Sequence, residues 1–313
     1  MINDFYIDYN THLIYNQDEN KNFWGFGMHF IKVTDDVYLL KTPFSIVWSG
    51  VVLIRGEKNF LIDSGAHDPQ AYIEPALAEL GMTFADVDWL LHTHAHGDHI
   101  SAHAAIAERY GTRVACLDKQ LANLTEPAAN AIRIRTKFPE YSPPPQSWLK
   151  GVQPDRVLGE FELLEERLMP IWTPGHDSDC VCWYDHKTKY IFTGDSLQGN
   201  GTPTQGIGFY QSLDDYLYTL RKLRVMDVQG IVLGHEYDGL GEIIEGREKV
   251  LSALDTCLEY VKSYDAFIKK MHAQGNDDSV EITKKLIGEL GCGQPENLFL
   301  ALYTVNGHLQ KMQ

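Results

Sequence analysis

Four side chains that can bind a metal ion lie within six positions of the chain: His94, His96, Asp98 and His99. They follow an apolar, strand-like segment at residues 87–91, and the amphipathic segment after them is typical of a helix. The cluster is therefore expected on a turn from a strand into a helix. In α/β proteins, functional residues often lie at the carboxyl ends of strands.

Three further residues of this kind each follow an apolar segment and a glycine. His176 lies in TPGH, Asp195 in FTGD and His235 in VLGH. If the strands are neighbours, all seven side chains meet at one edge of the fold. Five imidazoles and two carboxylates are too many for one cation and suit two, such as zinc ions. Asp195 is predicted to bridge the two metals together with a hydroxide derived from water.

The remaining pattern favours an α/β architecture. Short β-rich segments at residues 37–43, 50–56 and 59–65 precede a predicted helix that ends at Gly81. From residue 244 onward the pattern is helical only. We therefore predict three regions: an N-terminal extension (1–30), a central domain (31–243) and a helical C-terminal domain (244–313). The central domain is predicted to contain an inserted lid or wall (118–155).

The amino-acid composition limits the partners and the cellular compartment that we expect for this chain. The formal net charge of −16 argues against a polyanion bound by a broad basic face, although a local patch stays an alternative. Residues 1–10 lack the features of a signal peptide, and the chain has no apolar run of membrane-spanning length, so a cytoplasmic protein without membrane contact is expected. Five scattered cysteines fit reduced thiols. Cys180 and Cys182 are interpreted as small core residues, with soft metal ligands as the alternative.

The motifs HTHAHGDH, TPGH, FTGD and LGH, with LIDSG upstream, resemble those of the metallo-β-lactamase-fold hydrolases over about residues 31–240. This resemblance implies a four-layer αββα sandwich with the metals at one edge, followed here by an all-helical C-terminal extension. It also implies a role for each matching residue. His94, His96 and His176 would bind the first metal, and Asp98, His99 and His235 would bind the second. Asp195 would bridge the two metals. Asp98 would also take part in proton transfer, and Asp63 would orient a ligand loop through hydrogen bonds.

At two positions this chain differs from particular subfamilies, and these differences narrow the range of reactions that we expect. The family's true β-lactamases usually carry Cys or Ser where this chain has Asp195, and its oxygen-reducing di-iron members carry Glu in place of His96. The resemblance therefore favours hydrolysis of a small-molecule thioester, as in glyoxalase II-like enzymes, or of a lactone or other ester. Tyr210 is predicted as an oxyanion or substrate contact. Zinc is the expected metal, and iron or manganese are alternatives.

Two alternatives stay open. Residues 294–312 resemble the helical end of the lactamase-β-2-like branch, in which some members cleave single-stranded RNA, and loosely that of the quinolone-signal thioesterase type. A phosphodiesterase or endoribonuclease is therefore the second hypothesis, although nucleic acid is the less favoured partner. A catalytically weak binding or regulatory protein is the third, and the seven intact ligands argue against it. A homodimer also stays open.

Overall fold

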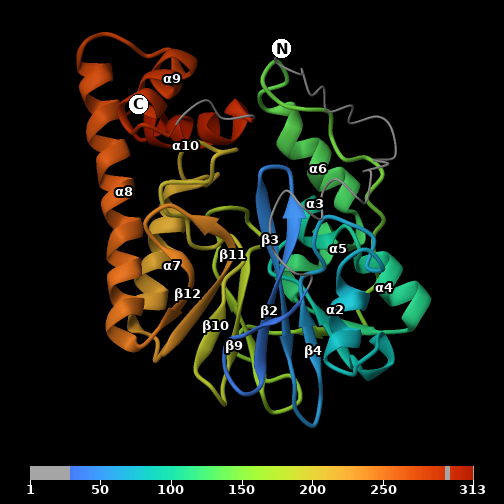
Figure 1. Ribbon diagram of the computed structural model, residues 1–313. Coiled ribbons are helices and arrows are strands. Elements are labelled where there is room, and N and C mark those ends of the chain that lie inside the picture. The colour runs from blue at the N-terminus through green and yellow to red at the C-terminus, as the bar shows by residue number, and fades with distance from the viewer. Residues whose placement is uncertain (1–28, 293–296, 313) are drawn as a thin grey trace, which may run out of the picture.

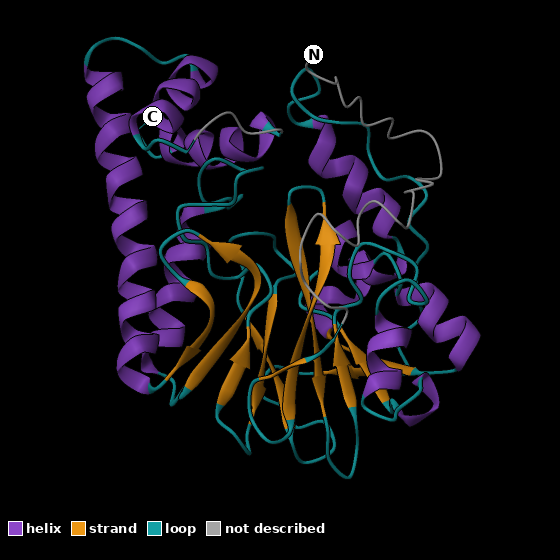
Figure 2. Ribbon diagram, in the orientation of Figure 1, coloured by secondary structure: helices purple, strands orange, loops and turns teal. Residues whose placement is uncertain are grey.

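The computed structural model describes residues 29–292 and 297–312, whose strands form two sheets packed face to face (Figures 1 and 2). Helices cover the outer face of each sheet, which confirms the four-layer αββα architecture and the C-terminal helices. Residues 1–28, most of the predicted N-terminal extension, lie outside the described residues. Within the described part, no helix is both long and apolar enough to cross a membrane.

The first sheet has seven strands in sequence order, and β4 to β7 run parallel to one another. Its strands are β1 (Ile31–Lys32), β2 (Val37–Phe44), β3 (Val47–Ile54), β4 (Phe60–Ile62), β5 (Trp89–Leu91), β6 (Arg113–Leu117) and β7 (Arg156–Leu158). The long hairpin of β2 and β3 lies beside β4, and every residue of β3 is buried.

The second sheet has five strands in the order β12-β11-β10-β9-β8. They are β8 (Leu168–Trp172), β9 (Val181–Asp185), β10 (Tyr190–Phe192), β11 (Gly230–Tyr237) and β12 (Gly241–Glu245). Apolar side chains of both sheets, including Leu39, Ile54, Trp183 and Phe192, form the core between them. Burial of this apolar surface holds the two sheets together.

Helices α2 (Ile73–Glu79) and α4 (His103–Tyr110) pack on the outer face of the first sheet, through residues such as Leu77 and Ile106. Helices α7 (Leu213–Val225) and α8 (Arg247–Ala273) cover the second sheet. Helix α7 begins after Ser212, whose hydroxyl accepts a hydrogen bond from the Asp215 amide.

The C-terminal helices share a hydrophobic core with the sandwich. Residues from α8, from α9 (Ser279–Glu289) and from α10 (Leu298–Gln310) pack in one cluster with residues of the second sheet. The helical region begins slightly later than the sequence indicates, because Ile243 and Ile244 pair with β11 and extend the sheet to Glu245.

The insertion at residues 118–155 connects β6 to β7 and contains α5 (Leu121–Thr125) and α6 (Pro127–Thr136). A long segment with little regular structure follows α6 and includes the three successive prolines. Helix α6 lies at the same end of the molecule as α10 (Figure 1). These two elements, which are far apart in sequence, therefore flank the end of the sandwich where the predicted site lies.

Candidate metal centre and active site

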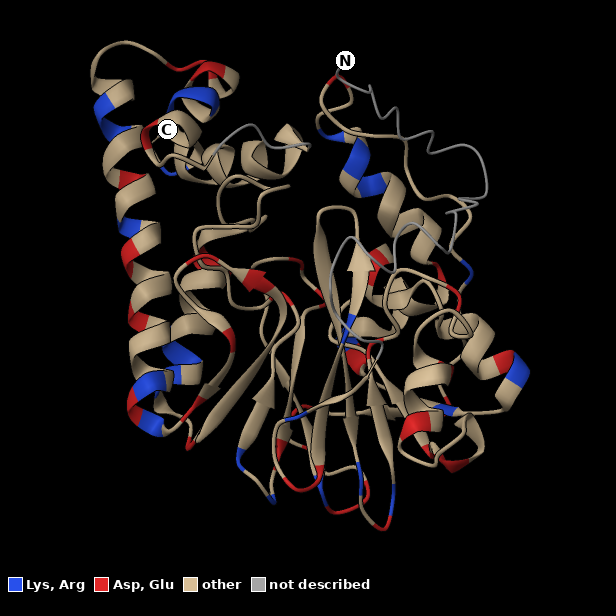
Figure 3. Cartoon of the chain, in the orientation of Figure 1, with Lys and Arg blue, Asp and Glu red and all other residues tan. Residues whose placement is uncertain are grey.

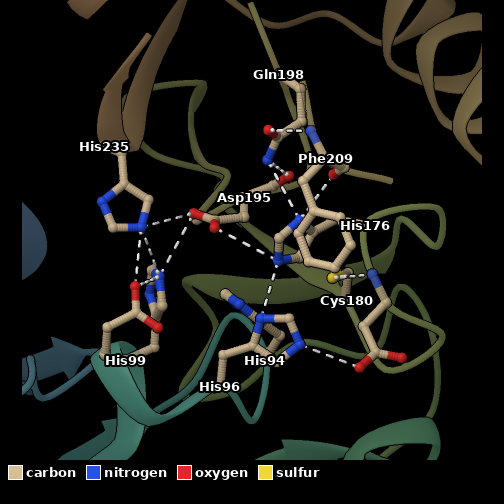
Figure 4. Close-up of polar contacts among 12 residues, drawn as sticks. His94, His96, His99, His176, Cys180, Asp195, Gln198, Phe209 and His235 are labelled. Atoms are coloured by element: carbon tan, nitrogen blue, oxygen red, sulfur yellow. Dashed lines mark hydrogen bonds and ion pairs between the residues drawn. The ribbon is translucent and has the colours of Figure 1, made fainter. Parts of the chain in front are cut away.

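The structure brings all seven predicted ligands together at one edge of the two sheets, and Figure 4 labels six of them. His94 and His96 lie on the turn after β5, whereas Asp98 and His99 lie in the short helix α3 (Gly97–Ile100). The other three come from the second sheet: His176 after β8, Asp195 after β10 and His235 within β11.

His235 differs from its predicted position in one respect. It lies inside its strand rather than after it, since β11 continues to Tyr237. The register between β11 and β12 is irregular from Val232 to Tyr237, so the strand is locally distorted where His235 enters the site. Such irregularities commonly redirect a side chain next to an active site.

Three imidazoles form the first candidate ligand group. One ligand-type nitrogen each of His94, His96 and His176 lies within 4.8 Å of the others. His96 Nδ1 and His176 Nε2 are 3.0 Å apart. At this distance one ring can donate a hydrogen bond to the other, or both rings can direct their lone pairs at one bound cation.

Asp98, His99 and His235 form the second group. The Nε2 atoms of His99 and His235 are 3.3 Å apart, and Asp98 Oδ2 lies 3.0 Å from His235 Nε2. Asp195 reaches both groups: its Oδ2 lies 3.4 Å from His176 Nε2, and its Oδ1 lies 3.4 Å from His99 Nε2. This is the placement expected of a carboxylate shared by two cations.

The donor geometry fits metal ions. Zinc binds imidazole nitrogen at about 2.0–2.1 Å in tetrahedral sites, which places neighbouring ligand nitrogens about 3.3 Å apart. The measured 3.0 and 3.3 Å are close to that value. In addition, His94 Nε2 is buried and has no hydrogen-bond partner among the described residues. A ligand set dominated by imidazole suits zinc, iron or copper better than magnesium or calcium.

In each of the five predicted ligand histidines, the ring nitrogen that points away from the ligand group has a hydrogen-bond partner. This partner fixes the orientation of the ring. Such outer contacts set the tautomer and raise the basicity of the ligand nitrogen. The partners are Thr93 Oγ1 for His94 (3.1 Å), Asp177 Oδ2 for His96 (3.2 Å), Asp63 Oδ2 for His99 (2.9 Å), Phe209 O for His176 (3.0 Å) and Trp48 O for His235 (2.5 Å).

Asp63 has the orienting position that the family resemblance implies. Its carboxylate accepts hydrogen bonds from the amide and the hydroxyl of Thr93, both at 2.7 Å, in addition to its contact with His99. It lies just after β4 in a left-handed backbone conformation with φ of 62°. Asp63 thus ties the turn after β5 to helix α3.

Burial and charge act differently on the two groups. Burial lowers the pKa of His94 and lowers that of His176 to about 4, so both rings are neutral, as a ligand must be. Burial opposes ionisation at Asp98 and His235 as well. At Asp98 the charges and hydrogen bonds of His99 and His235 are stronger than burial, and at His235 those of Asp195 and Asp98 are stronger. The pKa of Asp98 is lowered and that of His235 is raised to about 10. Cations at the second group would therefore have to displace protons.

A cavity opens over the two groups. Asp98 and His96 keep some solvent exposure, with side chains 13% and 14% exposed, and both line it. Its apolar wall comes from four parts of the chain: Phe44 and Val47 of the first hairpin, Ala131 and Ile134 of α6, Phe209 after β10, and Phe299 and Leu300 of α10. The insertion and the C-terminal helices therefore both shape this cavity.

Comparison with known proteins agrees with this geometry. The model of the metallo-β-lactamase superfamily matches residues 42–235. The chain belongs to the metallo-β-lactamase superfamily. In Drosophila melanogaster, a Beta-lactamase-like protein 2 homolog is 26% identical over 266 residues, which are 84% of this chain and 80% of that protein.

Two more proteins are similar to this chain. An Aspergillus fumigatus protein named Atrochrysone carboxyl ACP thioesterase is 29% identical over 206 residues, 65% of this chain and 54% of that protein. A crystal structure of a metallo-β-lactamase family protein from Thermus thermophilus superposes with a TM-score of 0.67 at 22% identity. It covers 90% of this chain and 95% of its own.

Tyr210 is not part of the cluster of seven predicted ligands. Tyr210 is buried, its hydroxyl lies 2.8 Å from His308 Nε2, and it is not among the described residues that line the cavity. Its neighbour Phe209 faces the cavity and packs on the His176 ring, with centroids 4.7 Å apart. Tyr210 therefore anchors α10 to the core, and its placement does not support the predicted substrate contact.

Cys180 and Cys182 fit the interpretation as core residues. Both are buried, and burial raises the pKa of each thiol, that of Cys182 to about 11. The Cys180 sulfur accepts a hydrogen bond from the Asp177 amide (Figure 4), and the Cys182 sulfur accepts one from the Thr173 hydroxyl. Neither cysteine is in the ligand groups found among the described residues.

Sequence reasoning missed Asp177 and Arg133. Asp177 is buried and contacts His96 Nε2, and both of its carboxylate oxygens accept hydrogen bonds from Arg133 Nη2 at 2.8 Å. Burial opposes ionisation of Asp177, but His96 and Arg133 together hold its pKa well below the usual value. The residue stands directly after His176, but its partner lies 44 positions earlier on α6, which no local pattern reveals. This contact attaches the insertion to a predicted metal ligand.

We expect about two divalent metal ions per chain in protein prepared without chelator, because Asp195 lies between two complete ligand groups. Elemental analysis of the purified protein measures this. One ion or none would contradict the dinuclear assignment.

We expect Asp177→Asn to weaken metal binding about 10–100-fold, because the His96 ring loses a charged partner that favours its metal-binding tautomer. Competition with a chromophoric chelator gives the affinity. Asp227→Asn, at an exposed position paired with Lys189, is the matched control and should bind metal normally. Equal affinity in both variants would exclude Asp177 from the support of the site.

Proposed function

We propose that the chain is a dinuclear metal-dependent hydrolase that cleaves a small carbonyl substrate, a thioester or another ester such as a lactone. One observation carries the proposal: the Asp195 carboxylate lies between two three-residue ligand groups on the floor of a cavity with apolar walls. Two divalent cations in such a site would lower the pKa of a water molecule and polarise a carbonyl oxygen.

The chain's own residues would support this chemistry in distinct ways. Asp98 faces the cavity and, being ionised, can accept a proton from the attacking water. The Ser49 hydroxyl donates a hydrogen bond to Asp98 Oδ2 at 3.3 Å and helps to hold this carboxylate in place. Apolar side chains such as Phe209 and Phe299 limit the access of bulk water and strengthen electrostatic interactions at the reacting carbonyl.

Several observations support a carbonyl substrate. Apolar side chains from the β2–β3 hairpin, from α6 and from α10 line part of the cavity, and polar side chains such as Thr204 and Gln205 line the rest, a mixture that suits a small organic molecule. A relative named as a thioesterase aligns with 65% of this chain. The acidic composition disfavours a long polyanion. Zinc is the metal that we propose, on the basis of the imidazole-rich ligand set.

Cleavage of single-stranded RNA is the second candidate. The specific observation in its favour is a row of basic residues beside the cavity: Arg133 and Arg135 on α6, and Lys137 directly after that helix. Phosphodiester substrates need such cations. Of this row, however, only Arg135 lines the cavity among the described residues, and Arg133 is paired with Asp177.

We expect Asp195→Asn to keep the fold but to lower turnover of an acyl thioester or lactone by more than about 100-fold. Loss of an outer partner of a metal ligand alone costs about 10–100-fold, and the bridging position should cost more. The assay compares metal-loaded wild type and variant on an acyl thioester, an acyl lactone and an activated phosphodiester. Asp227→Asn again serves as the control.

Phosphodiester turnover without thioester or lactone turnover would contradict the proposal and favour the nuclease hypothesis. Near-normal carbonyl turnover by Asp195→Asn would remove Asp195 from the mechanism.

A further inference from the structure

We infer that Gln205 is a substrate-binding residue, whose side-chain amide donates a hydrogen bond to a neutral carbonyl oxygen of the substrate other than the carbonyl that is cleaved. The inference rests on the proposed function and narrows its substrate class: an ester or thioester that also carries an amide group.

Gln205 lies in the segment between β10 and α7 and lines the same cavity as the predicted ligands Asp98 and Asp195. The residue is buried, with 6% of its surface exposed. Its side-chain Oε1 accepts a hydrogen bond from the Thr202 backbone amide at 3.2 Å. A backbone N–H can only donate, so this bond identifies the oxygen end of the carboxamide and leaves Nε2 as the donor at the other end.

The Nε2 donor of Gln205 makes no hydrogen bond within the part of the chain that the structure describes. It is also not among the fully buried polar atoms that lack a partner, so the nitrogen keeps some accessible surface, and the open space that Gln205 lines is the cavity. An amide donor in an otherwise buried side chain is unfavourable when it has no partner. An acceptor oxygen of the substrate would satisfy it.

Short-range hydrogen bonds hold Gln205 in this position. The backbone amides of Gln205 and Gly206 both donate to the Thr202 carbonyl, at 3.0 and 2.8 Å. The Thr202 and Thr204 hydroxyl oxygens are 2.8 Å apart, and the Asn297 amide donates to the Thr204 carbonyl at 3.3 Å, which ties the loop to the residue before α10. Because the side chain is positioned before the substrate arrives, little conformational entropy is lost on binding.

A second carboxamide lines the cavity from the insertion. Gln146 follows the three successive prolines, and its side chain lies against Gly97, where an added Cβ would come within 2.2 Å of Gln146 Oε1. Gly97 stands between the predicted ligands His96 and Asp98, so this carboxamide lies next to the metal-ligand turn. A carboxamide both donates and accepts, so Gln205 and Gln146 together can bind the carbonyl and the N–H of an amide.

The segment that carries Gln205 is neutral. Residues 196–212 contain no Lys, Arg, Asp or Glu, although acidic residues are spread over the rest of the chain (Figure 3). Neutral donors compensate poorly for the lost hydration of a charged group, but they can replace the water bound to an amide. Arg135 also lines the cavity, with its guanidinium carbon 4.5 Å from the centre of the Phe299 ring, so an anionic thioester is included in the test.

The test compares thioesters that differ by one amide. For the leaving group, S-(2-acetamidoethyl) thiobutyrate is paired with S-pentyl thiobutyrate, whose chain has the same length. For the acyl part, S-ethyl 4-acetamidothiobutyrate is paired with S-ethyl thioheptanoate. S-(2-carboxyethyl) thiobutyrate is the anionic comparison. Thiol release gives kcat/KM for each. We expect at least one amide thioester to exceed its alkyl partner about fivefold or more, and its identity shows on which side of the scissile bond Gln205 lies.

Two variants connect this preference to the side chain. Gln205→Glu keeps an oxygen for the Thr202 amide but removes the donor, whereas Gln205→Leu removes both. We expect each variant to lower the ratio of amide to alkyl kcat/KM about fivefold or more, without a comparable loss for the alkyl thioesters. Gln153→Glu, at an exposed position before β7, is the matched control and should leave the ratio unchanged. Every variant should bind as much metal as the wild type, which elemental analysis measures.

Several results would overturn the inference. Equal kcat/KM for amide and alkyl thioesters in the wild type would refute it and leave the proposed hydrolase intact, as would a ratio that neither Gln205 variant changes. Faster turnover of the anionic thioester than of both amide thioesters would indicate an anionic substrate instead. Turnover of no thioester, with cleavage of a single-stranded RNA oligonucleotide by the same preparation, would overturn the proposed function and with it this inference.

Discussion

The structure depends on one constraint: five imidazoles and two carboxylates are packed at a buried edge of the fold, with ligand atoms within 4.8 Å of one another in each group and as close as 3.0 Å. Burying so many polar groups is unfavourable unless charges and hydrogen bonds compensate for lost water. The outer contacts to Thr93, Asp63 and the carbonyls of Phe209 and Trp48 satisfy the far side of four rings. The ligand nitrogens on the opposite side of these rings face one another, and this arrangement fits bound cations.

The sandwich meets this constraint by placing the ends of strands from two sheets against each other. The first sheet supplies the turn after β5 with helix α3, and the second supplies residues at β8, β10 and β11. Close backbone approach is part of this construction, since a Cβ on Gly194 would lie 2.2 Å from the Thr93 hydroxyl. The insertion and the C-terminal helices then enclose the site, and Arg133 and Tyr303 connect these outer parts to each other and to the centre.

Local patterns, in which apolar segments are followed by Gly and a ligand-type residue, predicted an α/β arrangement and the convergence of the seven side chains, whereas the four-layer sandwich followed from the family resemblance. Contacts between distant segments could not be predicted this way. The bond between Asp177 and Arg133 joins the turn after β8 to an inserted helix, and Tyr210 faces α10 because the chain after β10 presents Phe209 to the cavity instead. Strand β12 was missed because its short pattern, GEIIE, merges with the helix that follows.

The central claim is that two metal ions share Asp195. X-ray diffraction from crystals of the zinc-loaded protein, measured at the zinc absorption edge, tests it directly. The account predicts two anomalous peaks on opposite sides of the Asp195 carboxylate, each about 2.0–2.2 Å from its nearest ligand atoms. One peak would belong to His94, His96 and His176, and the other to Asp98, His99 and His235. A single peak, or two peaks with Asp195 bound to neither, would contradict it.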